Sequence, residues 1–301
     1  MSRKKKRQEL TARNFPTAGE DAASAASLPL YGGPDSAYRL AFTDDQFLLK
    51  EDLRPIRMQL ELLKPEMVQR EHGIESTVVI FGSARIPPGD VAQQLLDNAR
   101  SSGDAAAVRR AESQFRMSHY YEEARRFGAL VTGASQHLNP PIYVVTGGGP
   151  GIMEAGNRGA REAGGKSIGL NIVLPHEQEP NPYITPELCF LFHYFGLRKM
   201  HFLMRSIALV CFPGGYGTMD ELFEVMTLMQ TGKCRKRPIL LFGREFWSRL
   251  VNFDVLVETG MIAPEDVKLF VYVETAEEAW KIICDTYAIE APLTGAYAED
   301  V

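Results

Sequence analysis

A glycine-rich turn between an apolar run and an amphipathic segment is the part of the chain best suited to chemistry. Residues 207–212 are typical of a buried parallel strand, and residues 222–229 have apolar side chains at helical spacing. Between them, Pro213–Glu221 reads PGGYGTMDE. The pattern predicts a strand, a tight turn and the start of a helix, whose unpaired N–H groups and partial positive charge suit an anion.

The side chains of this turn add donors and carboxylates to the anion site. We expect the anion to contact the backbone of three glycines and one hydroxyl, those of Gly214, Gly215, Gly217 and Thr218. Asp220 and Glu221 then place carboxylates in the first turns of the helix, where negative charge is favourable. An anion cradle beside a carboxylate predicts a phosphorylated ligand with chemistry close by.

Two other predicted strands end in residues that suit the same ligand. Residues 141–146 form an apolar run that leads into Gly147–Gly151, and a helix is expected after it. Residues 77–81 form another such run, followed by Gly-Ser. Either glycine turn alone is equally consistent with a structural turn, but two at the carboxyl ends of strands in one sheet favour a nucleotide-type site. The residues expected there are Ser83, Gly148 and Gly149.

Three charged residues are expected at this edge of the sheet. Arg198 and Lys199 follow the apolar, aromatic segment 188–195 and open a helix, where they are either site residues or ordinary surface charges. Arg198 is the better candidate, because a guanidinium binds phosphate or carboxylate through two parallel hydrogen bonds. Glu154, on the helix after the second glycine turn, is expected to face the same cleft.

Several common motifs are absent from the sequence. A dinucleotide fingerprint fails because Ile152 stands where its third glycine is needed, and a P-loop fails because Ala160 stands at its first glycine. Cys189 and His193 lack a second pair at metal-ligand spacing, and no G-x-S-x-G elbow supports a catalytic serine. Hydride transfer, ATP hydrolysis, metal catalysis and serine catalysis are therefore disfavoured.

The elements that position these residues alternate between strands and helices every 25–40 residues. This alternation predicts an α/β fold, a doubly wound parallel sheet of about seven strands that is Rossmann-like. The predicted strands are residues 77–81, 141–146, 166–173, 188–195, 207–212, 237–242 and 269–273. We expect two helices with a break at 101–104, a loop over 132–140 and one helix over 245–258.

The predicted domain organisation has four parts. Residues 1–36 are expected to be a disordered tail, and 37–75 a helical arm interrupted at Pro55, with an apolar stripe that packs on the core or on a second subunit. The folded domain is expected over 76–290 and a second tail over 291–301. The basic run at 3–7 is more often a solvated tail than a nucleic-acid or membrane arm.

The composition of the chain predicts where the protein is located and which classes of partner it lacks. The formal net charge of −5 gives no global attraction to nucleic acid, and no run approaches the roughly 20 apolar residues of a membrane helix. No secretory segment is visible, and the four cysteines are scattered. We therefore expect a cytoplasmic protein with no nucleic-acid or membrane partner.

The glycine turns also carry a resemblance to a known family. PGGYGTMDE at 213–221 resembles the P-G-G-x-G-T-x-x-E motif of the LOG family, the cytokinin riboside 5′-monophosphate phosphoribohydrolases once labelled lysine decarboxylases. GGGPGIMEA at 147–155, the Arg198-Lys199-Met200 helix start and FGSAR at 81–85 resemble its other motifs. The resemblance covers about residues 76–290, and the longer chain is similar to the longer bacterial members.

The resemblance implies hydrolysis of the N-glycosidic bond of a purine nucleoside 5′-monophosphate, such as AMP or a cytokinin riboside monophosphate. By this resemblance Glu221 acts at the ribose, Arg198 positions Glu221 or the substrate, and Glu154 contacts ribose hydroxyls. Lys199 joins the site only as a weaker candidate. No metal or redox cofactor is implied. A lysine decarboxylase would need a pyridoxal-phosphate lysine, and no residue stands out for that role.

One alternative of another class stays open. The same turns would serve a non-catalytic nucleotide-binding sensor or carrier, although Glu221 and Arg198 are not needed for phosphate binding alone. The base-binding residues are expected in regions 83–90 and 171–200. The resemblance and the apolar arm together imply a homodimer or a larger homo-oligomer.

Overall fold

The structure is a computed structural model that describes residues 15–25, 31–33, 36–175 and 179–290. The expectations for residues 1–14 and 291–301 lie outside these ranges. The chain divides after Leu60 into two compact units, of which the second, from Glu61 onward, carries the sheet. The domain boundaries drawn from the sequence stay predictions.

The first unit contains short helices and the start of a long one. Helix α1 (Ala18–Ser24) is capped by Thr17, and the one-turn elements η1 (Ala41–Thr43), α2 (Asp45–Leu48) and η2 (Glu51–Leu53) lead to α3 (Arg54–Glu71). The expected interruption at Pro55 is wrong, because α3 begins at Arg54. Proline is tolerated in the first turn of a helix, where its missing N–H has no partner to lose.

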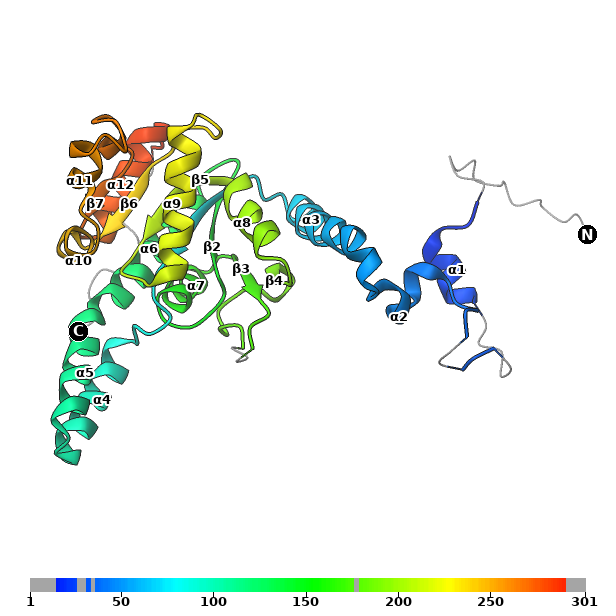
Figure 1. Cartoon of the computed structure of the whole chain (residues 1–301), viewed down its shortest axis with the longest axis horizontal. Coiled ribbons are helices and arrows are strands. Elements are labelled where there is room, and N and C mark those ends of the chain that lie inside the picture. Colours follow the sequence, from blue (N-terminus) through cyan, green and yellow to red (C-terminus); the bar gives the residue numbers. More distant parts are fainter. Residues whose placement is uncertain (1–14, 26–30, 34–35, 176–178, 291–301) are drawn as a thin grey trace, which may run out of the picture. The chain divides into compact units, whose positions relative to one another are not determined.

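A seven-stranded, all-parallel sheet forms the second unit and confirms the predicted fold class (Figure 1). The strands are β1 (Ser76–Phe81), β2 (Ile142–Thr146), β3 (Ser167–Ile172), β4 (Cys189–Phe192), β5 (Ser206–Cys211), β6 (Ile239–Phe242) and β7 (Val271–Val273). Their order is β4-β3-β2-β1-β5-β6-β7. The chain leaves β1 in one direction and returns to its other side at β5, so the switch point lies between β1 and β5. Open α/β sheets bind ligands at such a point.

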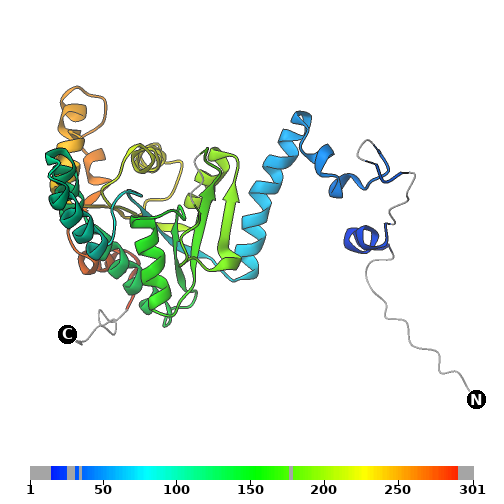
Figure 2. The same cartoon turned by 90° about the horizontal axis from the view of Figure 1, so that it is seen from below.

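Helices cover both faces of the sheet (Figure 2). Val78 and Ile80 of β1 point to one face and Val79 and Phe81 to the other, as the two-residue repeat of a strand requires. The first face is covered by α6 (His119–Ser135), α7 (Ile152–Glu162) and α12 (Ala276–Tyr287). The second is covered by α8 (Phe195–Met204), α9 (Tyr216–Gln230), α10 (Arg244–Leu250) and α11 (Phe253–Glu258).

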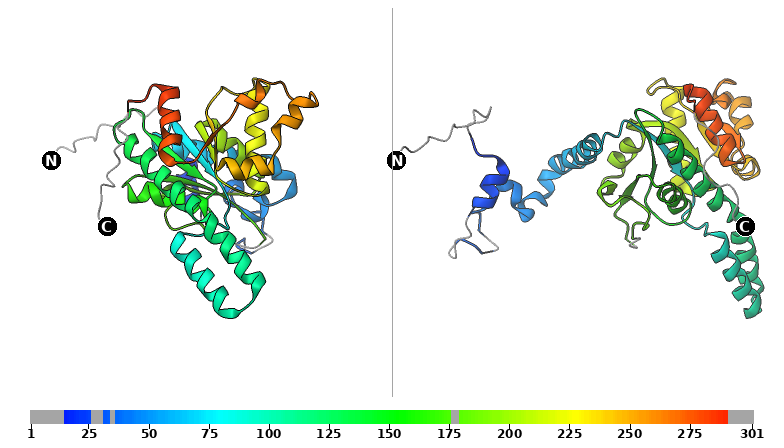
Figure 3. Two further views of the ribbon diagram at one scale, coloured as in Figure 1. Left: turned by 90° about the vertical axis from the view of Figure 1, so that its left-hand side faces the viewer. Right: turned by 180° about the vertical axis from the view of Figure 1, so that it is seen from behind.

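The segment between β1 and β2 forms a helical hairpin and a core helix. Helices α4 (Gly89–Ser102) and α5 (Ala105–Met117) lie side by side and project away from the sheet (Figure 3). The predicted break between them is confirmed: Gly103 ends α4 with a φ of 72°, a conformation that glycine adopts without strain. Helix α6 instead extends four residues, to Ser135, into the segment 132–140 that was expected to be a loop, because the Ser135 hydroxyl bonds both backbone groups of Ile142 at the start of β2.

One more expected helix is divided in the structure. Residues 245–258 form two helices, α10 and α11, and not one. The division falls at Val251, whose backbone is extended, and at Asn252, whose side-chain oxygen accepts a hydrogen bond from the amide of Val255. An asparagine in that position is a favourable helix cap, so it starts a new helix.

The second half of α3 fixes the start of α8. The Glu61 carboxylate accepts hydrogen bonds from the backbone amides of His193 (2.7 Å) and Tyr194 (3.1 Å), and Tyr194 is the residue before α8 begins. An acidic side chain at a helix N-terminus satisfies amides that have no partner within the helix. The helix that carries Arg198 is thereby held at its first turn.

Candidate active site

The turn after β5 leaves backbone amides open to a ligand. Gly215 precedes α9 and has no side-chain cap, and its carbonyl accepts the amides of Thr218 and Met219, both at 3.1 Å. Within the described residues, no hydrogen bond occupies the amides of Tyr216 and Gly217. These two N–H groups stand at the N-terminus of a 15-residue helix, which is favourable for a phosphate.

Gly214 lets this turn close on Thr218. A Cβ atom at Gly214 would lie 2.1 Å from the Thr218 hydroxyl oxygen, so no larger residue fits without moving the threonine. Thr218 itself is buried, with 6% of its surface exposed. The short turn therefore brings the hydroxyl and the open amides to one place.

A cavity of about 750 Å³ lies over this turn at the carboxyl edge of the sheet. Five segments line it: the end of β1, the turn into α7, α8, the turn into α9, and α10. Seven of the eleven residues expected at the site line this cavity: Ser83, Arg198, Gly214, Gly215, Gly217, Thr218 and Glu221. The other four, Gly148, Gly149, Glu154 and Lys199, do not line it.

Glu221 is a buried carboxylate on the cavity wall. Only 4% of its surface is exposed, and its Oε2 atom is buried without a hydrogen-bond partner in the described part of the chain. Burial raises the pKa of the Glu221 carboxyl to about 7, although the charge of Lys199 acts in the opposite direction. A carboxyl group with this pKa exchanges a proton readily near neutral pH, as a general base does.

The guanidinium of Arg198 contacts two backbone carbonyls and lies near Glu221. Its Nε–H donates to the carbonyl of Leu170 at 2.7 Å, and its Nη2 lies 3.5 Å from the carbonyl of Gly147. The guanidinium carbon lies 5.2 Å from the centre of the Phe202 ring. Burial lowers the pKa of Arg198, and the nearby Glu221 charge opposes this shift. A guanidinium stays charged at neutral pH, so it supplies positive charge to the cavity.

The glycine turn after β2 is closed to solvent. Gly147, Gly148 and Gly149 are all buried, and of these only Gly147 lines the cavity. The Gly148 amide donates to the Thr146 hydroxyl at 3.0 Å, and the Gly148 carbonyl accepts the amide of Asn181 at 2.9 Å. The two backbone groups of Gly148 are thus already in use within the protein.

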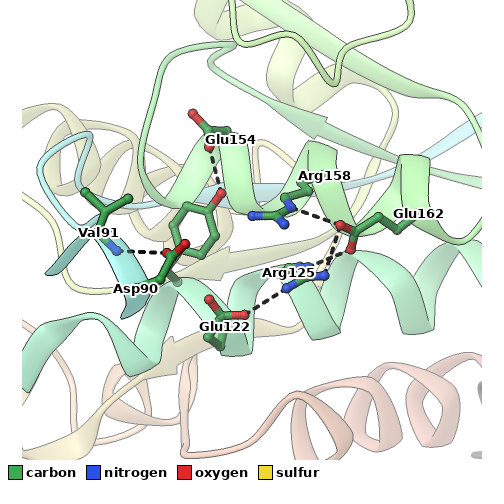
Figure 4. A network of polar contacts seen from close by, with 8 residues as sticks. Asp90, Val91, Glu122, Arg125, Glu154, Arg158 and Glu162 are labelled. Atoms are coloured by element: carbon green, nitrogen blue, oxygen red, sulfur yellow. Dashed lines mark hydrogen bonds and ion pairs between the residues drawn. The ribbon is translucent and has the colours of Figure 1, made fainter. Parts of the chain in front are cut away.

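Glu154 is held by the neighbouring helix. The Tyr121 hydroxyl of α6 donates to its Oε1 at 2.7 Å, and Tyr121 is fully buried. The same α6–α7 contact carries a cluster of ion pairs among Glu122, Arg125, Arg158 and Glu162 (Figure 4). Burial is the main cause that raises the pKa of the Tyr121 hydroxyl, followed by its hydrogen bond to Glu154. The expected contact of Glu154 with a ligand stays a prediction, and the observed contact joins α6 to α7.

Lys199 of α8 is paired with acidic residues of α9. Its Nζ forms ion pairs with Asp220 at 2.8 Å and Glu224 at 3.2 Å. These residues line a second hollow of about 460 Å³, which shares Tyr216, Met219 and Asp220 with the larger cavity. Asp220 therefore has a cationic partner as well as the favourable position near the helix N-terminus expected from the sequence.

Other residues line the cavity that the sequence does not assign one by one. Arg85 lies in the region 83–90, where base-binding residues are expected, and its position just after β1 is a signal that marks it individually. Phe246 and Leu250 belong to α10, and nothing in the sequence marks these apolar residues as part of the site. Met153 and Phe195 also line the cavity, so apolar side chains surround the charged centre.

Among the described residues, no group of three His, Cys, Asp or Glu side chains is arranged to hold a metal ion. The described helices also include none that is long and apolar enough to cross a membrane.

Comparison with known proteins places this geometry in a family. A family profile described as "Possible lysine decarboxylase" matches residues 153–283. The chain is 30% identical over 173 residues to the cytokinin riboside 5′-monophosphate phosphoribohydrolase LOG3 of Arabidopsis thaliana, across 56% of this chain and 76% of that protein. The chain belongs to the LOG family. A second LOG relative, the probable phosphoribohydrolase LOGL5 of Oryza sativa subsp. japonica, is 30% identical across 50% of this chain and 61% of its own length.

The solved structures that match this chain are less similar to it in sequence than the LOG relatives are. The molybdenum cofactor carrier protein of Chlamydomonas reinhardtii is 17% identical, with a TM-score of 0.43 over 71% of this chain and 99% of its own. The molybdenum cofactor binding protein of Rippkaea orientalis is 15% identical, with a TM-score of 0.43 over 70% and 95%. Likeness at this level says nothing about what this LOG protein binds.

Proposed function

We propose that the protein hydrolyses the N-glycosidic bond of a purine nucleoside 5′-monophosphate and releases the free base and ribose 5-phosphate. The observation that carries the proposal is the arrangement on α9. Open amides at its N-terminus and a buried carboxylate, Glu221, one turn further along line the same cavity. The names of the LOG relatives support the same class of reaction.

The 5′-phosphate would bind at the start of α9. The amides of Tyr216 and Gly217 and the hydroxyl of Thr218 offer donors, and the helix end offers partial positive charge. A phosphate fixed there holds the ribose over the next turn of the helix, where Glu221 lies. This use of binding energy away from the reacting atoms orients the bond to be broken.

Glu221 would act on the ribose and on water. As the C1′–N bond breaks, positive charge develops on the ribose, and the ionised carboxylate stabilises it. The carboxylate accepts a proton from the attacking water as the new C1′–O bond forms. That proton leaves with the purine. A pKa near 7 suits both halves of this cycle.

Arg198 would stabilise the departing base or the phosphate. Its guanidinium lies at the cavity wall near Glu221, and no ion pair within the described residues neutralises it. Positive charge at this place stabilises the negative charge that develops on the purine as the C1′–N bond breaks.

Pyridoxal-phosphate chemistry finds no support in this cavity. No lysine is among the described residues that line it, and the amine of Lys199 is paired with the carboxylates of Asp220 and Glu224. Pyridoxal phosphate requires a lysine amine for its covalent attachment. The name "Possible lysine decarboxylase" therefore does not describe an activity that we propose for this chain.

A nucleotide panel tests the proposal. Purified protein is incubated with AMP, GMP, IMP, CMP, isopentenyladenosine monophosphate and adenosine, and released base is measured by chromatography. We expect release from a purine monophosphate and none from adenosine, which lacks the phosphate. AMP binding without base release above the rate in buffer would instead support the sensor or carrier alternative.

We also propose that the protein is a homodimer or larger. Apolar side chains of α8 and α9 are exposed in the single chain, among them Phe195, Met200 and Met204. Light scattering after gel filtration should give at least twice the 33.6 kDa chain mass, and a monomer at working concentration would contradict it.

A further inference from the structure

The turn after β2 is closed by a ring of buried hydrogen bonds. The Gly148 amide donates to the Thr146 hydroxyl at 3.0 Å, which donates to Asn157 Oδ1 at 2.7 Å. Asn181 Nδ2 donates to the same Oδ1 at 3.0 Å and to the Gly148 carbonyl at 3.1 Å. Thr146 and Asn157 are 0% exposed and Asn181 is 6% exposed. Each member is satisfied, so the ring rigidifies the turn.

The ring draws on three separate parts of the chain. Thr146 ends β2, Asn157 lies in the middle of α7, and Asn181 belongs to the loop between β3 and β4. Asn157 Nδ2 also donates to the Ser167 hydroxyl at 2.9 Å, which ties the ring to β3. Such a network is costly to break, because each buried group left unpaired loses its hydrogen bond without regaining water.

The turn that the ring fixes is the support for Arg198. The Gly147 carbonyl lies 3.5 Å from Arg198 Nη2, and a Cβ atom at Gly147 would lie 2.8 Å from the same nitrogen. The guanidinium therefore packs directly on the turn. The Leu170 carbonyl of β3 accepts its Nε–H at 2.7 Å and fixes the other side.

This support has a consequence for Glu221. The two side chains interact through their charges, but no hydrogen bond or ion pair joins them in the described structure. A guanidinium free to move would form an ion pair with the buried carboxylate and occupy its open oxygen. Held on the carbonyls of Gly147 and Leu170, it leaves that oxygen available.

We propose that Thr146, Asn157 and Asn181 are positioning residues: their ring holds the glycine turn against Arg198 and so keeps the guanidinium apart from Glu221. Gly148 and Gly149 then serve the site through the shape of the turn and not through contact with a ligand. The kinetic part of the test rests on the proposed hydrolase function, whereas the spectroscopic part does not.

The first measurement is hydrogen exchange at the guanidinium N–H groups of Arg198 by NMR, on protein labelled with ¹⁵N-arginine, with the Nη2 hydrogens as the report on the Gly147 contact. Arg198→Gln identifies the signal by its loss. Thr146→Val keeps the side-chain shape but removes the hydroxyl, and Thr146→Ser keeps the hydroxyl as the matched control. We expect exchange to be about tenfold faster in Thr146→Val, the effect of losing about one buried hydrogen bond, and close to wild type in Thr146→Ser.

Asn181→Ala provides a second variant, because Asn181 lies in a loop and its loss is less dangerous to folding than a change in a central strand. It removes the Nδ2 donor to the Gly148 carbonyl and to Asn157 Oδ1 but keeps the backbone amide that also donates to Gly148, and we expect the same faster exchange. Both variants are first checked for a cooperative melting transition. Wild-type exchange at Arg198 in a folded Asn181→Ala protein, or in folded Thr146→Val, overturns the proposal.

The second measurement is kinetic. Thr146→Val should lower kcat for base release about tenfold with KM nearly unchanged, and the change should disappear in an Arg198→Gln background, since both changes then act on one missing guanidinium. Equal effects in both backgrounds would mean that the ring serves stability alone and would overturn the proposal. If the wild-type protein releases no base, the hydrolase proposal fails, and the NMR result still decides the role of the ring.

Discussion

The two glycine turns of this protein have similar sequences and opposite surroundings. After β5, Gly215 and Gly217 are exposed and leave amides at the start of α9 without partners in the described chain. After β2, Gly147–Gly149 are buried, and the polar groups of Gly148 bond to Thr146 and Asn181. The first turn is built to meet a ligand, and the second is built to hold other residues. A glycine-rich turn before a helix is therefore not by itself a binding site.

The acidic residues that follow the two turns differ in the same way. Glu221 has a buried oxygen without a partner in the described residues, whereas Glu154 accepts a hydrogen bond from Tyr121. An unpartnered buried carboxylate at a cavity wall is costly for folding, so it marks a functional residue more strongly than a satisfied one.

The largest expected difference in kcat is between Glu221→Gln and Glu154→Gln, in which each acid is replaced by its amide. Glu221→Gln should lower kcat for base release about 10³-fold, since a carboxylate acting on a proton contributes about 10²–10⁴. Glu154→Gln keeps a hydrogen-bond acceptor for Tyr121 and should lower kcat far less. Steady-state assays on both folded variants compare the two acids, and equal losses would remove the distinction between them.

Removal of the guanidinium should have the next largest effect. Arg198→Gln should lower kcat/KM about 10²-fold, in the range seen when one donor that stabilises developing charge is lost. Lys233→Gln, a change on an exposed residue after α9, is the control. A loss confined to KM would assign Arg198 to substrate binding alone.

A matched pair of glycine changes tests the two turns directly. Gly147→Ala places a methyl group 2.8 Å from Arg198 and should lower kcat about tenfold by displacing the guanidinium, since a shift of about 1 Å at a site can cost as much as 10²-fold. At Gly217 a Cβ atom meets no protein atom within 4 Å, so Gly217→Ala should fold normally. Because the Gly217 amide belongs to the proposed phosphate site, the effect of this change should fall on KM and not on kcat. A fall in kcat at Gly217 with a change in KM alone at Gly147 would contradict the roles assigned to the turns.

The smallest expected effect is on stability and its dependence on pH. The pKa of Glu221 is raised from 4.5 to about 7 by burial, so the folded state binds this proton more tightly than the unfolded state. The stability that this gives is complete below pH 4.5 and is lost as the pH rises through 7. Glu221→Gln should therefore melt at a higher temperature than wild type at pH 8, with a smaller difference at pH 5. Equal melting temperatures at pH 8 would mean that the carboxylate is not destabilising.

The sequence predicted the sheet well because its strands are short apolar runs with clear ends. Residues 77–81 and 207–212 are buried on both faces and needed no tertiary information to recognise. Helix ends that depend on distant partners were harder. The extension of α6 to Ser135 rests on a hydrogen bond to Ile142, and the division of α10 from α11 rests on a cap at Asn252.

The candidate site was predictable where one segment supplies it. Gly214–Thr218 and Glu221 share a single turn and helix, so their sequence spacing sets their geometry. The environment of Glu154 was not predictable, because Tyr121 comes from another helix 33 residues earlier. The closure of the second turn depends on Asn181, in a loop 33 residues after Gly148, and no local pattern links the two.

The most direct test of the proposed hydrolase activity is product analysis with AMP and the purified wild-type protein. Adenine and ribose 5-phosphate are quantified over time by chromatography and mass spectrometry, and AMP binding is measured by calorimetry on the same preparation. We expect both products to appear in equal amounts and in proportion to enzyme concentration. AMP that binds but yields adenine only at the rate seen in buffer would contradict the proposed activity.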